Sequence, residues 1–398
     1  MKKAIASLLL CVFCMMLFTG CWDSTELNER GIAEAIGLDQ NDKTGEINIT
    51  VQVVRVGALK TDGATEKSPI ENMTASGKTV FEAIRNVCTQ SDRKAYFAHT
   101  KVIVVGERLA RAGIGDIVDV FMRNHEGRPL CWVMVGRNAT AEKLLGVEHG
   151  LEEIQGAYLN NMIQKCTMTS KTSASTLLDL AKILSGDVGN PVTGAMEVVD
   201  QPIFPAEQKE TQGDTTQGIQ LTGTSVFQKD KLVGYLDAVE TRGLNLITGK
   251  MKSGIIDVPS PFAKNKLFSI VVLRTKSKID PKIENGTLSF HITVDEEADI
   301  GEQQGSADIS KPEVFEKVEK AYGEVLANEI KATVNKAQKE LRTDILGFGG
   351  ALNRKYPQEW KRVQDNWKTL FPDVPYTVSV SARLLRTGME IKSIQQES

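Results

Sequence analysis

The sequence predicts an α+β fold of three mixed α/β-type domains, with antiparallel or mixed sheets on which helices pack. Two breaks divide the chain: a polar stretch at 201–217, rich in Glu, Gln, Thr, Asp and Pro, and Pro259-Ser260-Pro261. Strands and helices alternate before the first break, whereas paired strands precede one long helix after the second. We therefore expect an N-terminal α/β domain over 21–200, a small middle domain over 218–262 and a C-terminal α+β domain with the long helix over 263–398.

In the N-terminal domain, alternation and capping signals predict the order of the elements. Ile49, Val51 and Val53 alternate with polar residues, as in a half-buried strand, and Thr79 and Glu82 have the spacing of a capping box. The expected strands and extended segments are 32–39, 47–56, 102–105, 130–135 and 196–199. The expected helices follow Thr79 and cover 107–112, 114–123, 141–145, 157–165 and 176–185.

After the polar stretch, strands are expected to come in pairs. Residues 223–227 and 232–236 flank Lys229-Asp230-Lys231, which is typical of a hairpin. Leu267–Arg274 and Leu288–Val294 read as two further strands, joined near Asp280-Pro281 and Asn285-Gly286.

The longest helix is expected to begin at Ser310, with Pro312 in its first turn and Glu313 completing a capping box. Apolar residues recur every three or four positions from Val318 to Ile345, so they form one face. Gly347-Phe348-Gly349-Gly350 should end or sharply bend this helix, because glycine weakens a helix. A second helix at 357–370 and a strand at 376–385 complete the prediction.

Residues 1–20 have the pattern of a lipoprotein signal peptide. Lys2-Lys3 precede an apolar run from Ala4 to Phe18, which is shorter than the ~20 residues of a membrane span. Leu17-Phe18-Thr19-Gly20-Cys21 resembles a lipobox, although Phe18 stands where Leu is usual. We expect the mature chain to begin at Cys21 with two acyl chains, which suffice for stable anchoring. The alternative is an ordinary signal peptide that happens to contain cysteines.

Composition limits the partners and the compartment. The chain has 398 residues, of which 41% are hydrophobic and 25% charged. Removal of residues 1–20 leaves 46 basic and 51 acidic residues, a net charge of −5, and no basic stripe, so nucleic acid is not an expected partner. Cys88, Cys131 and Cys166 are three thiols without regular spacing. We expect these three cysteines to be small buried apolar residues. The alternative is one disulfide with one remaining free thiol.

No motif assembles a nucleophile, a base and an orienting acid, so the prediction is that the chain is not an enzyme and holds no cofactor or metal. Ser76-Gly77-Lys78-Thr79 lacks the upstream glycine of a phosphate loop and reads as a helix start. The four histidines have no metal-ligand spacing, and His291 should face solvent or a strand neighbour. Sequence separation alone does not remove the possibility of a site assembled in the fold.

The most distinctive stretch is the corner between the two C-terminal helices. Its candidate residues are Phe348, Arg354, Lys355, Tyr356 and Trp360. One interpretation is structural, with glycines for the bend and aromatic rings for packing. The other is a partner-contact surface of aromatic and basic groups. The residues alone leave both open.

Short pieces along nearly the whole chain resemble the Ger(x)C family, the C-subunit lipoproteins of bacterial spore germinant receptors. The matching pieces are Cys21-Trp22-Asp23, Glu26-Leu27, Ile36-Gly37-Leu38-Asp39, Ala98-His99-Thr100-Lys101-Val102, Gly223-Thr224-Ser225-Val226-Phe227, Gly234-Tyr235-Leu236-Asp237, the block from Gln338 to Trp367, and Arg386-Thr387-Gly388. The order and spacing of these pieces together are specific. The resemblance implies three α/β-type domains, no catalytic activity, and lipidation at Cys21.

The resemblance further implies two membrane-embedded partners, the A and B subunits, in the inner spore membrane. We therefore expect a lipoprotein on the outer face of the cell membrane that acts by assembly within a nutrient germinant receptor. The alternative is an extracytoplasmic solute-binding lipoprotein of a transporter, which should have two similar lobes around a cleft.

Overall fold

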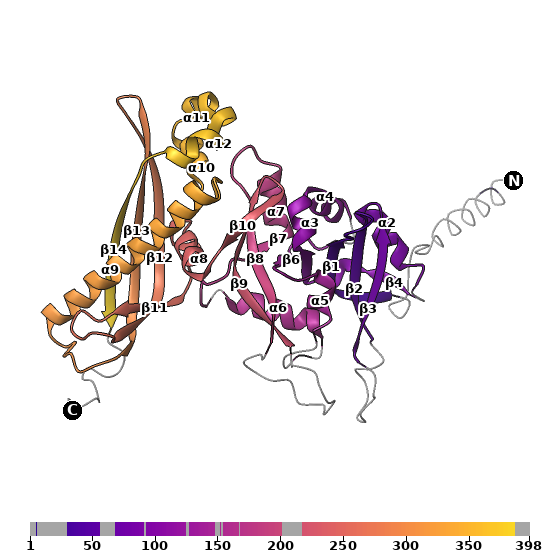
Figure 1. Cartoon of the computed structure of the whole chain (residues 1–398), viewed down its shortest axis with the longest axis horizontal. Coiled ribbons are helices and arrows are strands. Elements are labelled where there is room, and N and C mark those ends of the chain that lie inside the picture. The colour runs from indigo at the N-terminus through magenta and orange to yellow at the C-terminus, as the bar shows by residue number, and fades with distance from the viewer. Residues whose placement is uncertain are drawn as a thin grey trace.

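The computed structural model describes residues 30–55, 68–90, 93–124, 127–147, 154–166, 168–200 and 217–386, together with residues 5 and 152. Cys21, the polar segment 201–216 and the end of the chain from 387 lie outside these residues. The described part forms two sheets with packed helices, which confirms the α+β fold (Figure 1). None of its helices is both long enough and apolar enough to cross a bilayer.

Within the described residues, the larger sheet is mixed and has ten strands. Its main path is β10-β9-β8-β6-β5-β1-β2-β3, with β4 beside β1 and β7 beside β6. Strands β1, β5, β6 and β8 are parallel, and the two ends of the sheet are antiparallel. The strands are β1 (Arg30–Gln40), β2 (Ile47–Val54), β3 (Ile70–Gly77), β4 (Lys94–Tyr96), β5 (Val102–Gly106), β6 (Trp132–Gly136), β7 (Ser175–Thr176), β8 (Val192–Asp200), β9 (Gln217–Gln228) and β10 (Lys231–Leu236).

Helices cover both faces of this sheet. The sequence of strand β5 is continuously apolar because both of its faces are buried. Val102 and Val104 pack into one core, and Ile103 and Val105 pack into the other. The helices on the Ile103 side are α2 (Val80–Val87), α3 (Glu107–Ala112), α4 (Gly115–Arg123) and α7 (Leu177–Leu184). Those on the Val102 side are α5 (Ala141–Leu145) and α6 (Gln155–Cys166).

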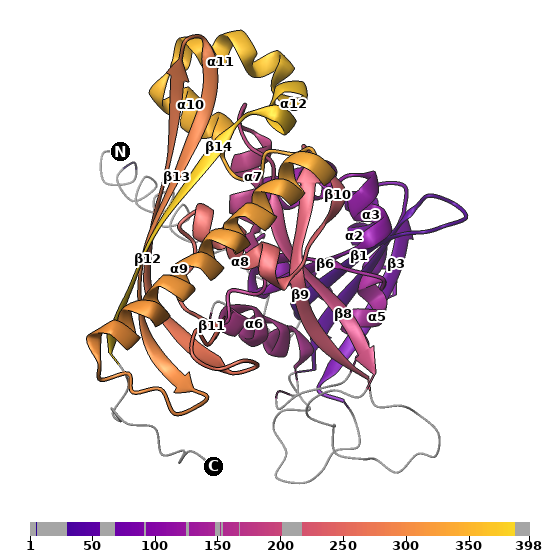
Figure 2. The ribbon, with the colours of Figure 1, turned by 60° about the vertical axis from the view of Figure 1, so that its left-hand side comes forward.

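The smaller sheet has the order β11-β12-β13-β14 and one helix-covered face. Its strands are β11 (Gly254–Pro259), β12 (Leu267–Glu284), β13 (Thr287–Gln303) and β14 (Tyr376–Arg386). Helix α9 (Pro312–Asn335) runs diagonally across one face, where Phe290, Ile292 and Val294 are buried (Figure 2). The β12–β13 hairpin turns at Asn285 and Gly286, which both have positive φ, 51° and 75°, as a tight hairpin turn requires.

The long helix keeps its predicted face but differs at both ends. Val318, Tyr322 and Leu326 are fully buried, which confirms the periodicity. The Ser310/Glu313 capping box is wrong, because the N-cap is Lys311 without a side-chain bond and the Ser310 hydroxyl bonds to Asp308. The α-helix ends at Asn335 in a π-helical turn, η4 (Lys336–Glu340), ahead of the glycines.

The region predicted as one second helix is divided into short pieces. These are α10 (Phe348–Lys355), α11 (Pro357–Val363), η5 (Gln364–Asn366), α12 (Trp367–Leu370) and η6 (Phe371–Asp373). Pro357 opens α11, because a residue without an N–H is tolerated only in a first turn.

Helix α8 (Ala238–Ile247) joins the two halves of the molecule, the half built on the large sheet and the half built on the small sheet. It touches β9 and β10 of the large sheet, β12 and β13 of the small sheet, and α9. The hydroxyls of Thr241 on α8 and Thr224 on β9 lie 2.9 Å apart, and Asn245 donates to the carbonyl of Ser170 at 3.2 Å. Residues 218–262, predicted as a middle domain, are thus shared between the sheets. The apolar core of the small sheet continues into Val192 and Val226 of the large one.

Candidate functional site

The predicted corner is built around the buried carboxylate of Asp344. It accepts the backbone N–H groups of Gly347, Phe348 and Gly349 at 3.0, 3.1 and 2.7 Å, and the indole N–H of Trp367 at 2.9 Å. Gly347 has φ 85°, a left-handed conformation that glycine adopts without strain. Burial raises the pKa of Asp344, and the four donors oppose that rise. Asp344 therefore caps α10, a role that the sequence prediction missed.

Phe348 and Trp360 lie inside this corner. Phe348 is fully buried and stacks on Phe290 of β13 at a ring-centroid distance of 4.3 Å. Trp360 is 4% exposed and meets Trp367 edge-on at 5.4 Å. A Cβ on Gly349 would come within 2.8 Å of the Trp360 ring, so the bend needs glycine there. This burial favours the structural interpretation for the two aromatic residues.

The other three candidate residues form the outside of the corner. Lys355 donates to the Asp280 carboxylate and to the carbonyl of Pro281, both at 3.0 Å, and so ties α10 to the β12–β13 hairpin. Tyr356 is half-buried beside that ammonium group. Arg354 is exposed and makes no ion pair with another described residue. A partner-contact role for this outer side stays a prediction.

The corner also contacts the large sheet. Asn190, just before β8, donates to the carbonyl of Asp344 at 3.2 Å. Lys368 of α12 donates to the side-chain oxygen of Gln228, at the end of β9, at 2.7 Å. Together with α8, the corner therefore connects the two halves at a second place.

The crevice where parallel α/β sheets usually bind ligands is occupied by side chains of this chain. After β5 the chain turns to one face of the sheet, and after β6 it turns to the other, which makes their carboxyl ends a switch point. There the Asp39 carboxylate accepts the N–H groups of Ala141 and Glu142 at 2.8 and 3.0 Å. A Cβ on Gly106 would lie 2.0 Å from Asp39. The first N–H groups of α5 are thus already satisfied.

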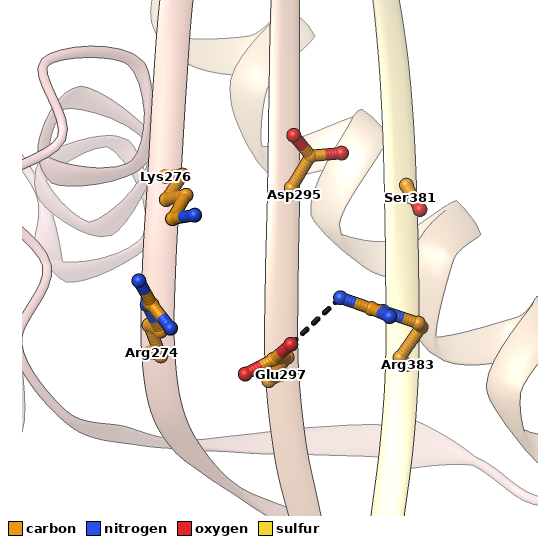
Figure 3. Close-up of a pocket in the computed structure, with 6 residues that line it drawn as sticks. All are labelled: Arg274, Lys276, Asp295, Glu297, Ser381 and Arg383. Atoms are coloured by element: carbon orange, nitrogen blue, oxygen red, sulfur yellow. Dashed lines mark hydrogen bonds and ion pairs between the residues drawn. The ribbon is translucent and has the colours of Figure 1, made fainter.

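A shallow charged depression lies on the face of the small sheet opposite α9. Figure 3 shows its lining residues, which come from three adjacent strands: Arg274, Lys276, Asp295, Glu297, Ser381 and Arg383. Glu297 and Arg383 form an ion pair at 2.6 Å, and Lys276 lies opposite Asp295 in the strand register. Opposite charges on neighbouring strands stabilise such an open face. The lining offers no nucleophile activated by a base.

The thiols and His291 do not form a reactive centre. Cys131 and Cys166 are buried, and burial raises the pKa of their thiols to about 12 and about 11. Cys88 follows the last turn of α2 and is exposed, so the expectation that it is buried is wrong.

His291 faces its strand neighbour Thr377, with the ring Nδ1 and the Thr377 hydroxyl oxygen 2.7 Å apart. The described residues contain no cluster that could hold a metal ion. Cys21 lies outside them.

Comparison with known proteins covers both halves of the chain. Residues 23–198 match the family described as spore germination protein N-terminal domain, and residues 222–388 match spore germination B3/GerAC like, C-terminal. Spore germination protein KC of Bacillus subtilis (strain 168) is 26% identical over 100% of this chain and 98% of its own length. Spore germination protein B3 of the same strain is 23% identical, over 94% and 96%.

A solved structure shares the fold. The crystal structure of the GerBC protein matches with a TM-score of 0.53 and 19% sequence identity, over 91% of this chain and 100% of the other.

Proposed function

Because this chain belongs to the Ger(x)C family of spore germination proteins, we propose that it is the lipid-anchored C subunit of a nutrient germinant receptor. Cys21 would attach it to the outer face of the membrane, by resemblance the inner spore membrane. There it would assemble with the membrane-embedded A and B subunits and contribute to germination by assembly, without catalysis.

The observation that carries this proposal is the extent of the similarity. The two family models together reach from residue 23 to residue 388, and germination protein KC aligns over 98% of its length. The likeness is therefore to the whole subunit, including both sheets and the α8 junction.

The solute-binding alternative has less support. Such a protein needs an open cleft, and the switch point of the large sheet is filled by Asp39. The halves also differ: in the part of the chain that the structure describes, one is a ten-stranded mixed sheet covered on both faces and the other a four-stranded sheet covered by α9. They are not the two similar lobes that a hinged solute-binding protein would have.

Lipid attachment is tested at Cys21. Mass spectrometry of the mature N-terminus should find a diacylglyceryl cysteine at residue 21, and Cys21→Ala should accumulate as the unprocessed precursor. Cys14→Ala, inside the apolar run, is the matched control and should be processed normally. A mature chain that starts elsewhere and lacks lipid would contradict the anchoring proposal.

A further inference from the structure

Glu296 is a deeply buried carboxyl group on the inner face of β13. Its side chain is 1% exposed and lies under α9, where one oxygen accepts the Tyr322 hydroxyl at 2.5 Å. The other oxygen, Oε2, is buried and has no hydrogen-bond partner among the described residues. Directly opposite on β12, the Thr275 hydroxyl is buried and equally unpartnered within the described part of the chain.

Arg242, the cation that acts electrostatically on Glu296, is already engaged. Arg242 of α8 binds both carboxylate oxygens of Glu329 on α9, through Nε at 2.8 Å and through Nη2. The carboxylate of Asp257 on β11 also interacts electrostatically with this guanidinium. From β14, the residue opposite Glu296 is Ala382, which carries no charge. Arg242 is thus the guanidinium near both carboxyl groups, and Glu329 already binds it. An ionised Glu296 would be a buried charge without a counter-ion, which is energetically costly.

We propose that Glu296 is a proton-operated latch that holds α9 against the small sheet and, through α9, holds α8 in the junction between the two halves. The protonated carboxyl keeps the hydrogen bond from the Tyr322 hydroxyl and adds no charge beside Glu329. Loss of the proton leaves a second buried carboxylate beside Glu329, which already engages Arg242. The inference goes beyond the germination role and does not depend on it.

Burial supports the protonated state, because it raises the pKa of Glu296 from 4.5 to about 7, with Glu329 adding to the rise and Tyr322 and Arg242 opposing it. A group whose pKa is raised in the closed form binds its proton more tightly there than in an opened form. The closed form is therefore fully favoured below pH 4.5, loses stability as pH rises toward 7, and stays at the lower level above that.

Glu296 lies where a release of α9 from the small sheet would also affect the contacts of α8 with the large sheet. Thr333, one turn beyond Glu329 on α9, donates to the carbonyl of Glu240 on α8 at 2.8 Å. Helix α8 in turn contacts β9 through Thr241 and Thr224. A release of α9 near Glu296 would thus alter the α8 junction without disturbing the far side of the large sheet.

Hydrogen exchange of the purified full-length protein between pH 4.5 and 8.5 tests the latch. After correction for the intrinsic pH dependence of exchange, protection of the α8 and α9 amides should fall by up to about tenfold per pH unit from pH 5 to 7 and then level off. Protection of β1 and β2 should stay constant. Glu296→Gln keeps the shape of the side chain and cannot ionise, so its α8 and α9 protection should not vary with pH.

Two further variants keep the test decisive. Glu302→Gln, at an exposed position of the same strand, should retain the wild-type pH dependence. Tyr322→Phe removes the one hydrogen bond that stabilises the ionised form, so protection should go on falling to higher pH than in the wild type. The proposal is wrong if wild-type protection of α9 is flat, if Glu296→Gln keeps the decline, or if β1 and β2 lose protection in parallel.

Discussion

Replacement of Trp360 by alanine is expected to lower the free energy of unfolding by about 3–5 kcal/mol, the usual cost of removing a buried tryptophan. The indole is 4% exposed, packs against Trp367 at 5.4 Å and covers Gly349. Its removal leaves a cavity that the capped turn around Asp344 cannot fill by a simple shift. Urea denaturation of the purified protein measures the loss directly.

Lys361→Ala is the matched control for this substitution. Lys361 is the exposed neighbour of Trp360, so its removal should leave the unfolding midpoint unchanged. Lys355 cannot serve as this control, because its ion pair with Asp280 ties α10 to the hairpin. A Trp360→Ala protein with unchanged stability but weaker co-purification with the membrane subunits would instead establish a contact surface at this corner.

Hydrophobic periodicity predicted the helices and strands that bury one face. It did not predict where strands with polar outer faces end. The stripe from Val318 to Val334 identified α9 because every member is buried. Strand β12 was expected to stop at Arg274, yet it continues to Glu284. Its outer face there carries Lys276 and Lys278, and Pro281 falls within the strand, so the segment looked like a loop.

The candidate site was predicted in part for a different reason. Trp360 and Phe348 were noticed because aromatic residues and glycines gather at one bend. The ion pairs were missed because their members are far apart in the sequence: Lys355 and Asp280 are 75 residues apart, and Arg242 and Glu329 are 87 apart. In sequence, such charges are indistinguishable from solvated ones on helix surfaces. Only the crossing of α8 and α9 shows that Arg242 and Glu329 are buried.

That crossing depends on Gly243 of α8. A Cβ placed there would come within 2.1 Å of the Thr333 hydroxyl oxygen and 2.6 Å of the carbonyl oxygen of Glu329. The second of these is helix backbone and cannot rotate away, so the two helices would have to separate. Separation would also strain the Arg242–Glu329 pair and the Thr333 bond to α8.

Gly243→Ala is therefore expected to destabilise the protein by about 3 kcal/mol, the upper part of the usual range for overpacking, despite alanine being the better helix former. Gly323→Ala on α9 is the matched control, since its Cβ would meet only the Ala382 side chain at an ordinary 3.7 Å. That variant should be more stable than the wild type by about 0.5–1 kcal/mol. Opposite signs in denaturant unfolding would show that close α8–α9 contact, and not helix propensity, sets the requirement for glycine at 243. Equal stabilisation by both substitutions would mean that the helices can separate at no cost, and the junction between the two sheets would then be looser than these contacts indicate.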